Sequence, residues 1–274
     1  MWKGVGLSAS VANLHGETCV VYTLTKGWKA EMVGFLGTEA LYEQEVDLQR
    51  DLLIYGIDDT AAAIREYSLG ISPYSPKLRR SFTNFSAYDS NERLDGVNLL
   101  LGDTSAEFQL PTIYIGATIN VPYMGMSIGD AYNQGALPEE RTVWYLGSRN
   151  YSSEECDWAR YNQRLLAGHE VDLDIAIKTA LAELNGVQSR VILNMDVVDP
   201  VWAPAVQRPA GFGYEPRELL KALRSLEGAP VPLVQVCGVC VQDQETGALA
   251  QTARLAAEFS RELALTVFSY KLKA

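Results

Sequence analysis

From residue 96 onward, short apolar runs alternate with helical patterns, and this alternation constrains the fold more than any other feature. The apolar runs are typical of strands buried in a sheet, and most of them end at a glycine or an acidic turn. The helical segments between them supply the crossovers that consecutive parallel strands require. We therefore expect a three-layer α/β/α domain with a mainly parallel central sheet. The expected strands are 97–101, 112–115, 142–146, 191–193, 233–236 and 265–270, and the expected helices are 153–166, 173–184, 217–226 and 250–263.

Local signals mark the ends of these helices. Ser152 and Glu155 have the spacing of a capping box at the start of the first expected helix. Asn185 and Gly186 are suited to stop the second, and Pro216 suits the first turn of the third. These ends therefore follow from local chemistry alone.

Residues 1 to 90 carry weaker patterns. Short strands are expected at 5–8 and 18–24, and residues 48–67 have a helical pattern that Gly56 interrupts. Residues 68–91 are rich in Ser, Pro, Asn and Arg, so a long loop is expected there.

Composition and charge describe an ordinary globular chain. With 274 residues, of which 47% are hydrophobic and 21% charged, it can bury a substantial core. No repeat or convincing linker interrupts it, so we expect a single domain over residues 1–274. The net charge of -11 argues against nucleic acid and an anionic membrane as partners, since both need a basic surface. The sequence contains neither a signal peptide nor an apolar run of about 18 residues, so a cytoplasmic location is expected.

Histidine and cysteine are scarce. The chain has two histidines, His15 and His169, so catalysis that needs several imidazoles is nearly excluded. The four cysteines are too sparse for a disulfide scaffold. Cys237 and Cys240 have the spacing of a redox or zinc pair, but no second pair and no nearby histidine accompany them. We interpret them as two buried strand thiols.

The fourth expected strand carries the most distinctive chemistry. Its apolar run predicts burial on both faces, and Pro200 prevents the strand from continuing. The strand end carries one amide, Asn194, and two carboxylates, Asp196 and Asp199. Ligand sites in open α/β sheets lie at such strand ends. Two interpretations stay open here: a functional site, or side chains that only satisfy the hydrogen bonds of a turn.

Three blocks of the sequence, in order, resemble signatures of the arginase/agmatinase (ureohydrolase) family. The central block resembles an Asp-x-Asp-x-x-Asp-Pro-x-x-Ala-Pro pattern with Asn at its first position. The resemblance covers about residues 95–274 and implies the ureohydrolase fold. The first block, at 147–155, is a Gly-x-Arg strand end with the helix after it. The central block is 194–204, followed by 208–209, Gly213 and 217–218. The third block is the strand 233–237 with the helix 252–257.

This resemblance implies a site with two manganese ions at the strand ends. In the family the ions lower the pKa of a bridging water, and hydroxide then attacks a guanidinium or amidine carbon. Manganese needs several carboxylates and neutral imidazoles for this purpose. Because most of those positions hold other residues in this chain, we expect neither a manganese site nor another cofactor.

The substitutions can be followed motif by motif. Thr104 stands where a Gly-Gly-Asp-His-Ser motif has its histidine ligand. Thr118 and Asn120 replace the histidine and the last aspartate of an Asp-Ala-His-x-Asp motif. Asn194 replaces the first aspartate of the Asp-x-Asp pair, whereas Asp196 is retained. By this resemblance Asp196 is the single metal ligand that survives.

The Asp-Ala-His-x-Asp motif has a second candidate match. Residues 116–120 read Gly-Ala-Thr-Ile-Asn, and residues 130–134 read Asp-Ala-Tyr-Asn-Gln. The first match is preferred because it follows an apolar strand and lies a full crossover before Gly147. Neither match contains the histidine, so the expected loss of metal ligands does not depend on the choice.

Three functions are compatible with this pattern. A degenerate ureohydrolase would keep the fold, lack the manganese site, and bind a polar small molecule or serve a structural or regulatory role. A metal-independent enzyme would use Cys237 as the nucleophile and Asp196 as the base on an amidine or guanidine carbon. An inactive partner subunit of an active homologue is the third. The pocket would be lined by Asp103, Thr104, Thr118, Asn120, Asn194, Asp196 and Gln235.

Gln235 stands at the position of the glutamate that pairs with the substrate guanidinium in the family. A charge-assisted hydrogen bond contributes roughly 1.5 to 3 kcal/mol and a neutral amide about half of that. The preference of the pocket for a guanidinium ligand should therefore fall, and an amide-like or carboxylate-bearing ligand suits the pocket equally well. By the same resemblance Asp103 and Asp199 brace loops, and a homo-oligomer, either a trimer or a hexamer, is expected.

Overall fold

The computed structural model describes most of the chain from residue 97 onward and parts of the region before it. The described residues are 9–14, 17–22, 52–56, 58–68, 70–72, 74–75, 80–81, 85–87, 97–103, 110–120, 128–134, 142–242 and 246–268. Thr104 and the expected strand at 5–8 lie outside these ranges, as does the end of the expected strand at 18–24.

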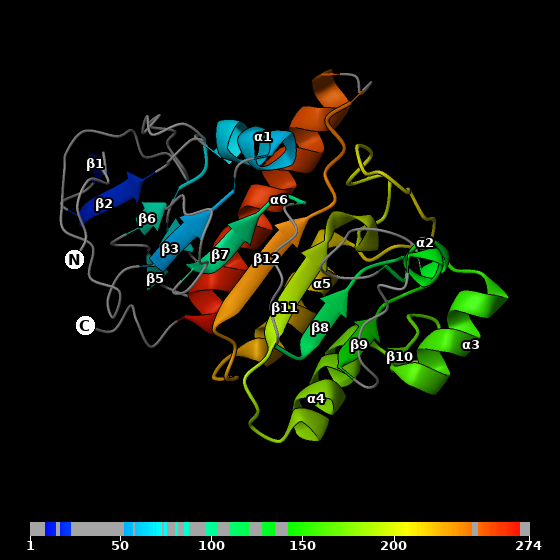
Figure 1. Ribbon diagram of the computed structural model, residues 1–274. Helices are drawn as coiled ribbons and strands as arrows, with labels where there is room; N and C mark the ends of the chain where they lie inside the picture. The colour runs from blue at the N-terminus through cyan, green and yellow to red at the C-terminus, as the bar shows by residue number, and fades with distance from the viewer. Residues whose placement is uncertain are drawn as a thin grey trace.

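The described residues form an eight-stranded sheet in which every neighbouring pair of strands runs parallel. Figure 1 shows these strands side by side, with their carboxyl ends at one common edge. The parallel sheet that the alternating pattern predicts is therefore confirmed. The strand order is β10 (Arg164–Leu166), β9 (Val143–Leu146), β8 (Thr112–Ile115), β11 (Arg190–Asn194), β12 (Leu233–Cys237), β7 (Val97–Leu101), β3 (Leu52–Tyr55) and β6 (Phe85–Ala87).

Helices cover both faces of this sheet. Ile113 and Ile115 of β8 pack into the larger core, whereas Tyr114 between them packs into the smaller core on the opposite face. The described helices are α1 (Asp59–Ser68), α2 (Ile128–Asn133), α3 (Ser153–Asn162), α4 (Leu173–Leu184), α5 (Pro216–Leu223) and α6 (Thr246–Val267), with short 3-10 helices η1 (Met195–Val197) and η2 (Arg224–Leu226). The larger core contains side chains of α1, α4, α5 and α6, and the smaller core contains side chains of α2 and α3. The three-layer α/β/α architecture is thus confirmed.

The central strands are buried on both faces, which explains why they read as unbroken apolar runs. All four residues of β8 and all four of β9 are buried. Burying each large aliphatic side chain contributes about 1.5 to 3 kcal/mol. The sheet is therefore a rigid support for the polar residues that follow its strands.

The predicted helix ends agree with the structure. Ser152 Oγ accepts a hydrogen bond from Glu155 N, and Glu155 Oε2 accepts one from Ser152 N, so α3 begins with the expected capping box. Asn185, with φ of 47°, ends α4 in the left-handed conformation. Pro216 lies in the first turn of α5.

The helical pattern expected over 48–67 is wrong in its first half. Leu52–Tyr55 forms β3 and pairs with β6 and β7, and α1 begins only at Asp59. Gly56 separates them because the chain passes close to β7. A Cβ atom at Gly56 would lie 2.5 Å from the carbonyl oxygen of Leu101.

The helix expected over 153–166 is too long. It ends at Asn162, and β10 follows as the edge strand of the sheet. The buried side chain of Gln163 fixes this change, since its Oε1 accepts hydrogen bonds from Thr142 N at 3.0 Å and Val143 N at 2.9 Å. A long-range contact therefore ends this helix.

Two further expectations need correction. The strand expected over 265–270 is helical as far as Val267, because α6 continues and buries Leu265 and Val267 in the larger core. The loop expected over 68–91 contains short strands, namely β4 (Tyr74–Ser75), β5 (Arg80–Ser81) and β6.

Near the N-terminus, β1 (Ala9–Leu14) and β2 (Glu17–Tyr22) form an antiparallel pair. Within the described ranges, no helix has both the length and the apolar composition needed to cross a membrane.

Candidate functional site

Polar residues that follow β7 and β8, that end or follow β11, or that lie within β12 come together at the carboxyl edge of the sheet. The register explains this, because Ile115 lies beside Leu193 and Asn194 lies beside Cys237 in neighbouring parallel strands. The strands thus end at nearly the same level. The residues brought together here, called the strand-end cluster below, are Asp103, Thr118, Asn120, Asn194, Asp196 and Gln235.

Asp196 is the buried anion of the strand-end cluster. Its side chain is 3% exposed, and both oxygens accept hydrogen bonds: Oδ1 from Ala117 N at 2.8 Å and Oδ2 from Thr118 Oγ1 at 2.7 Å. Burial raises the pKa of Asp196 from 3.8 to about 6. The bonds from Thr118 and Ala117, and the charge of Arg149, lower it but do not cancel the effect of burial.

A chain of hydrogen bonds runs from Asp196 to the surface. Thr118, which donates to Asp196, accepts a bond from Asn120 Nδ2 at 3.0 Å. The Oδ1 atom of Asn120 in turn accepts a 3.4 Å bond from Nη1 of Arg208, an exposed residue. Asn120 and Thr118 each accept one of these bonds and donate the next, so all the bonds run in one direction from the guanidinium to the buried carboxylate.

Asn194 is held in place by three neighbours. Its Oδ1 accepts from Asp196 N at 3.1 Å, and its Nδ2 donates to the hydroxyl of Tyr114 at 2.8 Å. Gly238 has φ of 84°, and a Cβ atom there would overlap Asn194 Oδ1. A glycine is therefore required at Gly238 for β12 to pass this close to the amide.

Gln235 and Asp103 are bound to the backbone of neighbouring strand ends. The buried amide of Gln235 donates from Nε2 to Gly102 O at 2.8 Å. Asp103 Oδ1 accepts from Gly238 N at 2.7 Å, and its Oδ2 accepts from Thr60 Oγ1 at 3.2 Å. Although Asp103 retains exposed surface, partial burial of its carboxyl group raises the pKa, with Asp58 adding to the effect.

Cys237 lies at the end of β12 in surroundings that oppose a thiolate. It is 7% exposed, and its Sγ lies 3.8 Å from Leu193 O. Burial raises the pKa of Cys237 well above its usual value, and the charges of Asp103 and Asp196 add to this effect. The two thiols also differ, which corrects the expectation of a buried strand pair: Cys240 is only partly buried and follows the strand.

Asp199 and Arg149 brace the loop that follows β11. Asp199 Oδ1 accepts from Val201 N at 3.0 Å, and its Oδ2 accepts from Gly213 N at 3.1 Å. Arg149 Nη2 donates to Asp196 O and to Ala210 O, both at 3.0 Å. These contacts hold the loop that carries Arg208 against the strand ends.

Sequence reasoning did not single out Tyr114, Arg149 and Arg208 as members of this site. Tyr114 is hidden inside an apolar strand, and only the alternation of faces along β8 could have indicated that it points away from the larger core. Arg149 and Arg208 lie in two of the blocks noted above, at 147–155 and 208–209, but the resemblance gave neither a role in the site.

The described residues do not fit a pair of manganese ions. Among them, no group of three or more His, Cys, Asp and Glu side chains is placed to hold a metal ion. Both oxygens of Asp196 and Oδ1 of Asn194 already accept hydrogen bonds, and the hydroxyl of Thr118 is directed at Asp196. Neutral amides and hydroxyls are weak ligands compared with carboxylate and imidazole.

The two candidate matches to the Asp-Ala-His-x-Asp motif lie in different places. Residues 116–120 follow β8, which pairs directly with β11, and they contact Asp196. Residues 130–134 belong mainly to the short helix α2, where Asp130 is exposed. The geometry favours 116–120, because only these residues continue a strand adjacent to the one that carries Asp196.

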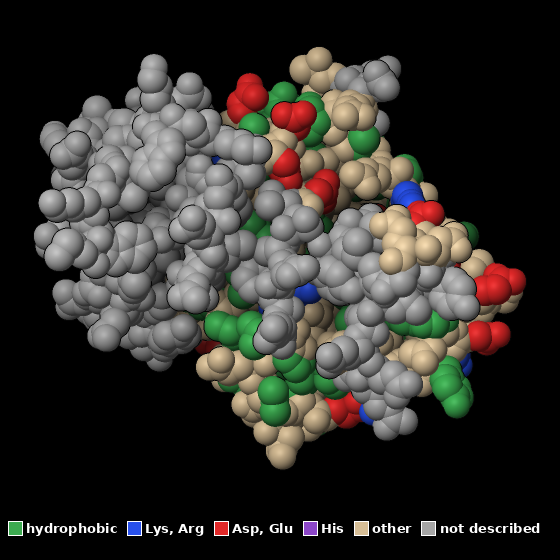
Figure 2. Space-filling model, in the orientation of Figure 1, with side chains coloured by type: hydrophobic (Ala, Val, Ile, Leu, Met, Phe, Trp, Pro, Cys, Tyr) green, Lys and Arg blue, Asp and Glu red, His purple; other side chains and the backbone are tan. Residues whose placement is uncertain are grey.

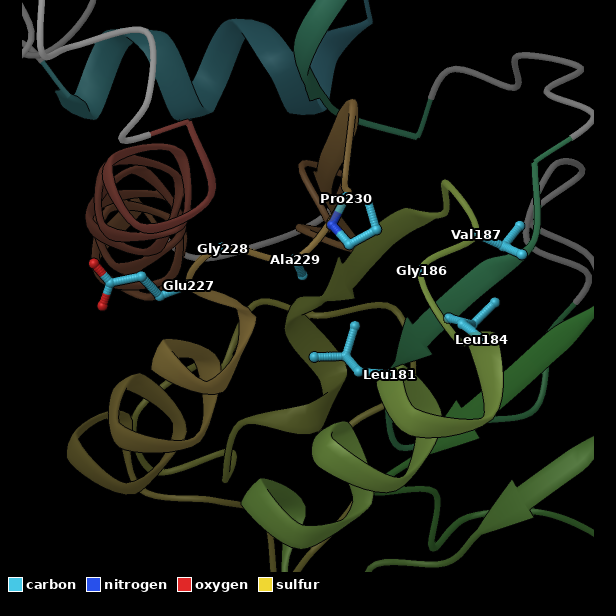
Figure 3. A pocket seen from close by; sticks show the side chains of 8 residues that line it. All are labelled: Leu181, Leu184, Gly186, Val187, Glu227, Gly228, Ala229 and Pro230. Carbon is cyan, nitrogen blue, oxygen red and sulfur yellow. The ribbon is translucent and has the colours of Figure 1, made fainter.

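A hollow at the opposite edge of the sheet is a less suitable site. This cavity has a volume of about 230 Å³. It lies between the end of α4 and the loop before β12 (Figure 3). Its walls are mainly apolar, and Glu227 supplies its one carboxylate. Because sites in parallel sheets lie at the carboxyl ends of strands, the strand-end cluster is the better candidate. The lining residues are Leu181, Leu184, Gly186, Val187, Glu227, Gly228, Ala229 and Pro230.

Comparison with known proteins assigns the family. A model of the arginase family matches residues 116–266, which is more than half of the 274 residues. The chain therefore belongs to the arginase family, as its motifs indicate.

Individual relatives are distant. An agmatinase of Bacillus subtilis is 23% identical in an alignment 251 positions long that covers 74% of this chain and 82% of the relative. The structure of proclavaminate amidino hydrolase from Streptomyces clavuligerus aligns with a TM-score of 0.57 and 17% identity, covering 81% of this chain and 94% of that one. A hypothetical agmatinase from Burkholderia thailandensis aligns with a TM-score of 0.62 and 14% identity, covering 88% and 92%. At these identities the structural likeness establishes the fold alone.

Proposed function

We propose that this chain is an arginase-family protein that does not assemble a binuclear manganese centre and binds a polar small molecule at the strand-end cluster. One observation carries the proposal: both oxygens of Asp196 are engaged by Ala117 and Thr118. The retained carboxylate is thus part of a hydrogen-bonded network inside the protein.

The chemistry of the neighbouring residues supports the same proposal. Thr118, Asn120 and Asn194 are neutral, so Asp196 supplies the one negative charge of this group. Two divalent ions carry four positive charges and need several anionic ligands and imidazoles to balance and orient them. A hydroxide formed on such ions is the nucleophile of the family reaction, so loss of the ions removes guanidine hydrolysis by that route.

Gln235 supports a ligand other than a guanidinium. Its amide nitrogen already donates to Gly102 O, and its side chain has no charge to pair with a cation. The burial and the raised pKa of Cys237 oppose formation of the thiolate that a cysteine nucleophile needs. We therefore favour binding over catalysis by a thiolate.

The manganese content of the full chain tests this proposal. After incubation with excess Mn²⁺ and desalting, elemental analysis is expected to find close to zero ions per chain. Urea release from agmatine should be absent, with the Bacillus subtilis agmatinase assayed in parallel as the positive control. Close to two ions per chain, or urea release by this protein, would contradict the proposal.

A variant that restores ligands sharpens the test. The combined change Thr118→His, Asn120→Asp and Asn194→Asp returns the family's residue types to three positions around Asp196. This variant should retain more Mn²⁺ after desalting than the unchanged chain, because imidazole and carboxylate are preferred ligands. Equal and substantial retention by both proteins would place the metal elsewhere and contradict the proposed role of these positions.

A further inference from the structure

We propose that the strand-end cluster binds a carboxylate-bearing small molecule through Arg208. This inference rests on the proposed function, because it names the ligand class of the same metal-free site. The hydrogen-bond donors and acceptors at the carboxyl edge of the sheet that make no contact within the protein are available to a ligand.

The carboxylates that follow β7 and β11 are oriented by the protein itself. Asp103, Asp196 and Asp199 each accept a hydrogen bond from the protein on both oxygens. Each ionised oxygen can accept a second bond, so some acceptor capacity remains on these groups. Asp196, however, is 3% exposed, so its remaining capacity is not open to solvent.

Arg208 carries exposed hydrogen-bond donors that the protein leaves unused. A guanidinium has five N–H donors, and among the described residues Arg208 uses one bond, to Asn120 Oδ1. Its side chain is exposed, so the other donors are accessible from solvent. Independently, Nη1 of Arg149 is buried and has no hydrogen-bond partner among the described residues. Arg149 follows β9, and its guanidinium donates to Ala210 O in the loop that carries Arg208.

The position of Arg208 is set from the protein interior. Asn120, its partner, is 9% exposed and donates to Thr118 Oγ1 at 3.0 Å and to the Tyr114 hydroxyl at 3.4 Å. These two bonds require that Nδ2 of Asn120 faces inward and Oδ1 faces Arg208. The guanidinium is therefore oriented before a ligand arrives, which reduces the entropy lost on binding.

A planar guanidinium pairs with a carboxylate through two parallel hydrogen bonds, which a point charge cannot reproduce. A guanidinium-bearing ligand would instead meet a like charge that has no acceptor atoms. Figure 2 shows several Asp and Glu side chains on the visible described surface and only small areas of Lys and Arg. Because the whole chain carries a net charge of -11, binding of an anion must depend on this short-range contact.

Titration calorimetry of the full chain with defined probes tests the inference. At constant ionic strength, succinate or citrate should bind the unchanged protein, and agmatine should bind at least about tenfold more weakly. Arg208→Gln should weaken carboxylate binding at least about tenfold, and Arg208→Lys should weaken it less, since one charge remains. Arg254→Gln, at an exposed arginine of α6, is the matched control and should leave binding unchanged.

Several results would overturn the inference. These are tighter binding of agmatine than of the carboxylates, failure of both carboxylates to bind, binding that Arg208→Gln leaves unchanged, or binding of inorganic phosphate alone. Arg208 is exposed, so its variants are expected to fold, and circular dichroism checks this. The manganese measurement is independent: a metal-free protein without carboxylate binding refutes this inference alone, whereas a manganese-loaded protein refutes the proposed function.

Discussion

The hydroxyl of Thr118 donates a 2.7 Å hydrogen bond to Oδ2 of Asp196, across 78 positions of the sequence. The bond joins the segment after β8 to the 3-10 turn after β11. It also connects Asp196 to Asn120, because Thr118 accepts from that amide while it donates to the carboxylate. Thr118 is therefore the central member of the strand-end cluster.

Replacing Thr118 by valine should destabilise the protein. The change keeps the shape of the side chain but removes a donor from Asp196 and an acceptor from Asn120, so the free energy of unfolding should fall by about 1 to 3 kcal/mol. Urea denaturation measures this. Thr118→Ser retains the hydroxyl and loses one methyl group, which contributes about 0.8 kcal/mol. A valine variant that is as stable as the serine variant would contradict the role of the hydroxyl.

Stability should depend on pH through Asp196. Its pKa is about 6 in the folded protein and 3.8 without the fold, so the folded state holds the proton more tightly. The stabilisation from this group is complete below pH 3.8 and is lost as pH rises through about 6. A pKa shift of this size corresponds to a change of about 3 kcal/mol in the free energy of unfolding.

The variant Asp196→Asn isolates this contribution, because the remaining titratable groups are common to both proteins. The stability of the variant relative to the unchanged protein should increase between about pH 4 and pH 7. Urea denaturation at several pH values gives the difference directly. A difference that does not vary with pH would mean that Asp196 titrates normally in the folded protein.

Gly238→Ala should be strongly destabilising. A left-handed conformation disfavours alanine by about 1 to 2 kcal/mol, and the added Cβ would also displace the side chain of Asn194 from its bond to Tyr114. The total loss of stability should exceed about 2 kcal/mol. Gly247→Ala is the control, because this helical glycine faces open space and alanine there should stabilise by up to about 1 kcal/mol. Equal effects at the two positions would refute the steric argument.

Alkylation should discriminate between the thiols. Cys237 is buried and its pKa is raised, whereas Cys156 and Cys240 are partly exposed. Iodoacetamide followed by mass spectrometry should label Cys237 at least about tenfold more slowly than Cys240. Selective and rapid labelling of Cys237 would instead support the thiol-based chemistry that its position in the sequence suggests.

The alternating strands and helices from residue 96 onward could be predicted because their signals are local. The bounds of β7, β8 and α4 agree with the expected ranges, since apolar runs and helix caps act within a few residues. The failures have non-local causes. β3 is a strand because β6 and β7 flank it, and α3 ends where the side chain of Gln163 caps the backbone at the start of β9.

Patterns in the sequence were enough to predict the alternating α/β elements, the family resemblance and the residue types at the ends of the strands. Thr118, Asn120, Asn194 and Asp196 could be named from their positions in motifs alone. The contacts of their oxygens and nitrogens depend on the assembled fold, because the partners come from different strands far apart in the chain. Hydrogen bonds depend on distances of a few ångströms and on direction, and parallel strands reach that precision only after the sheet has assembled.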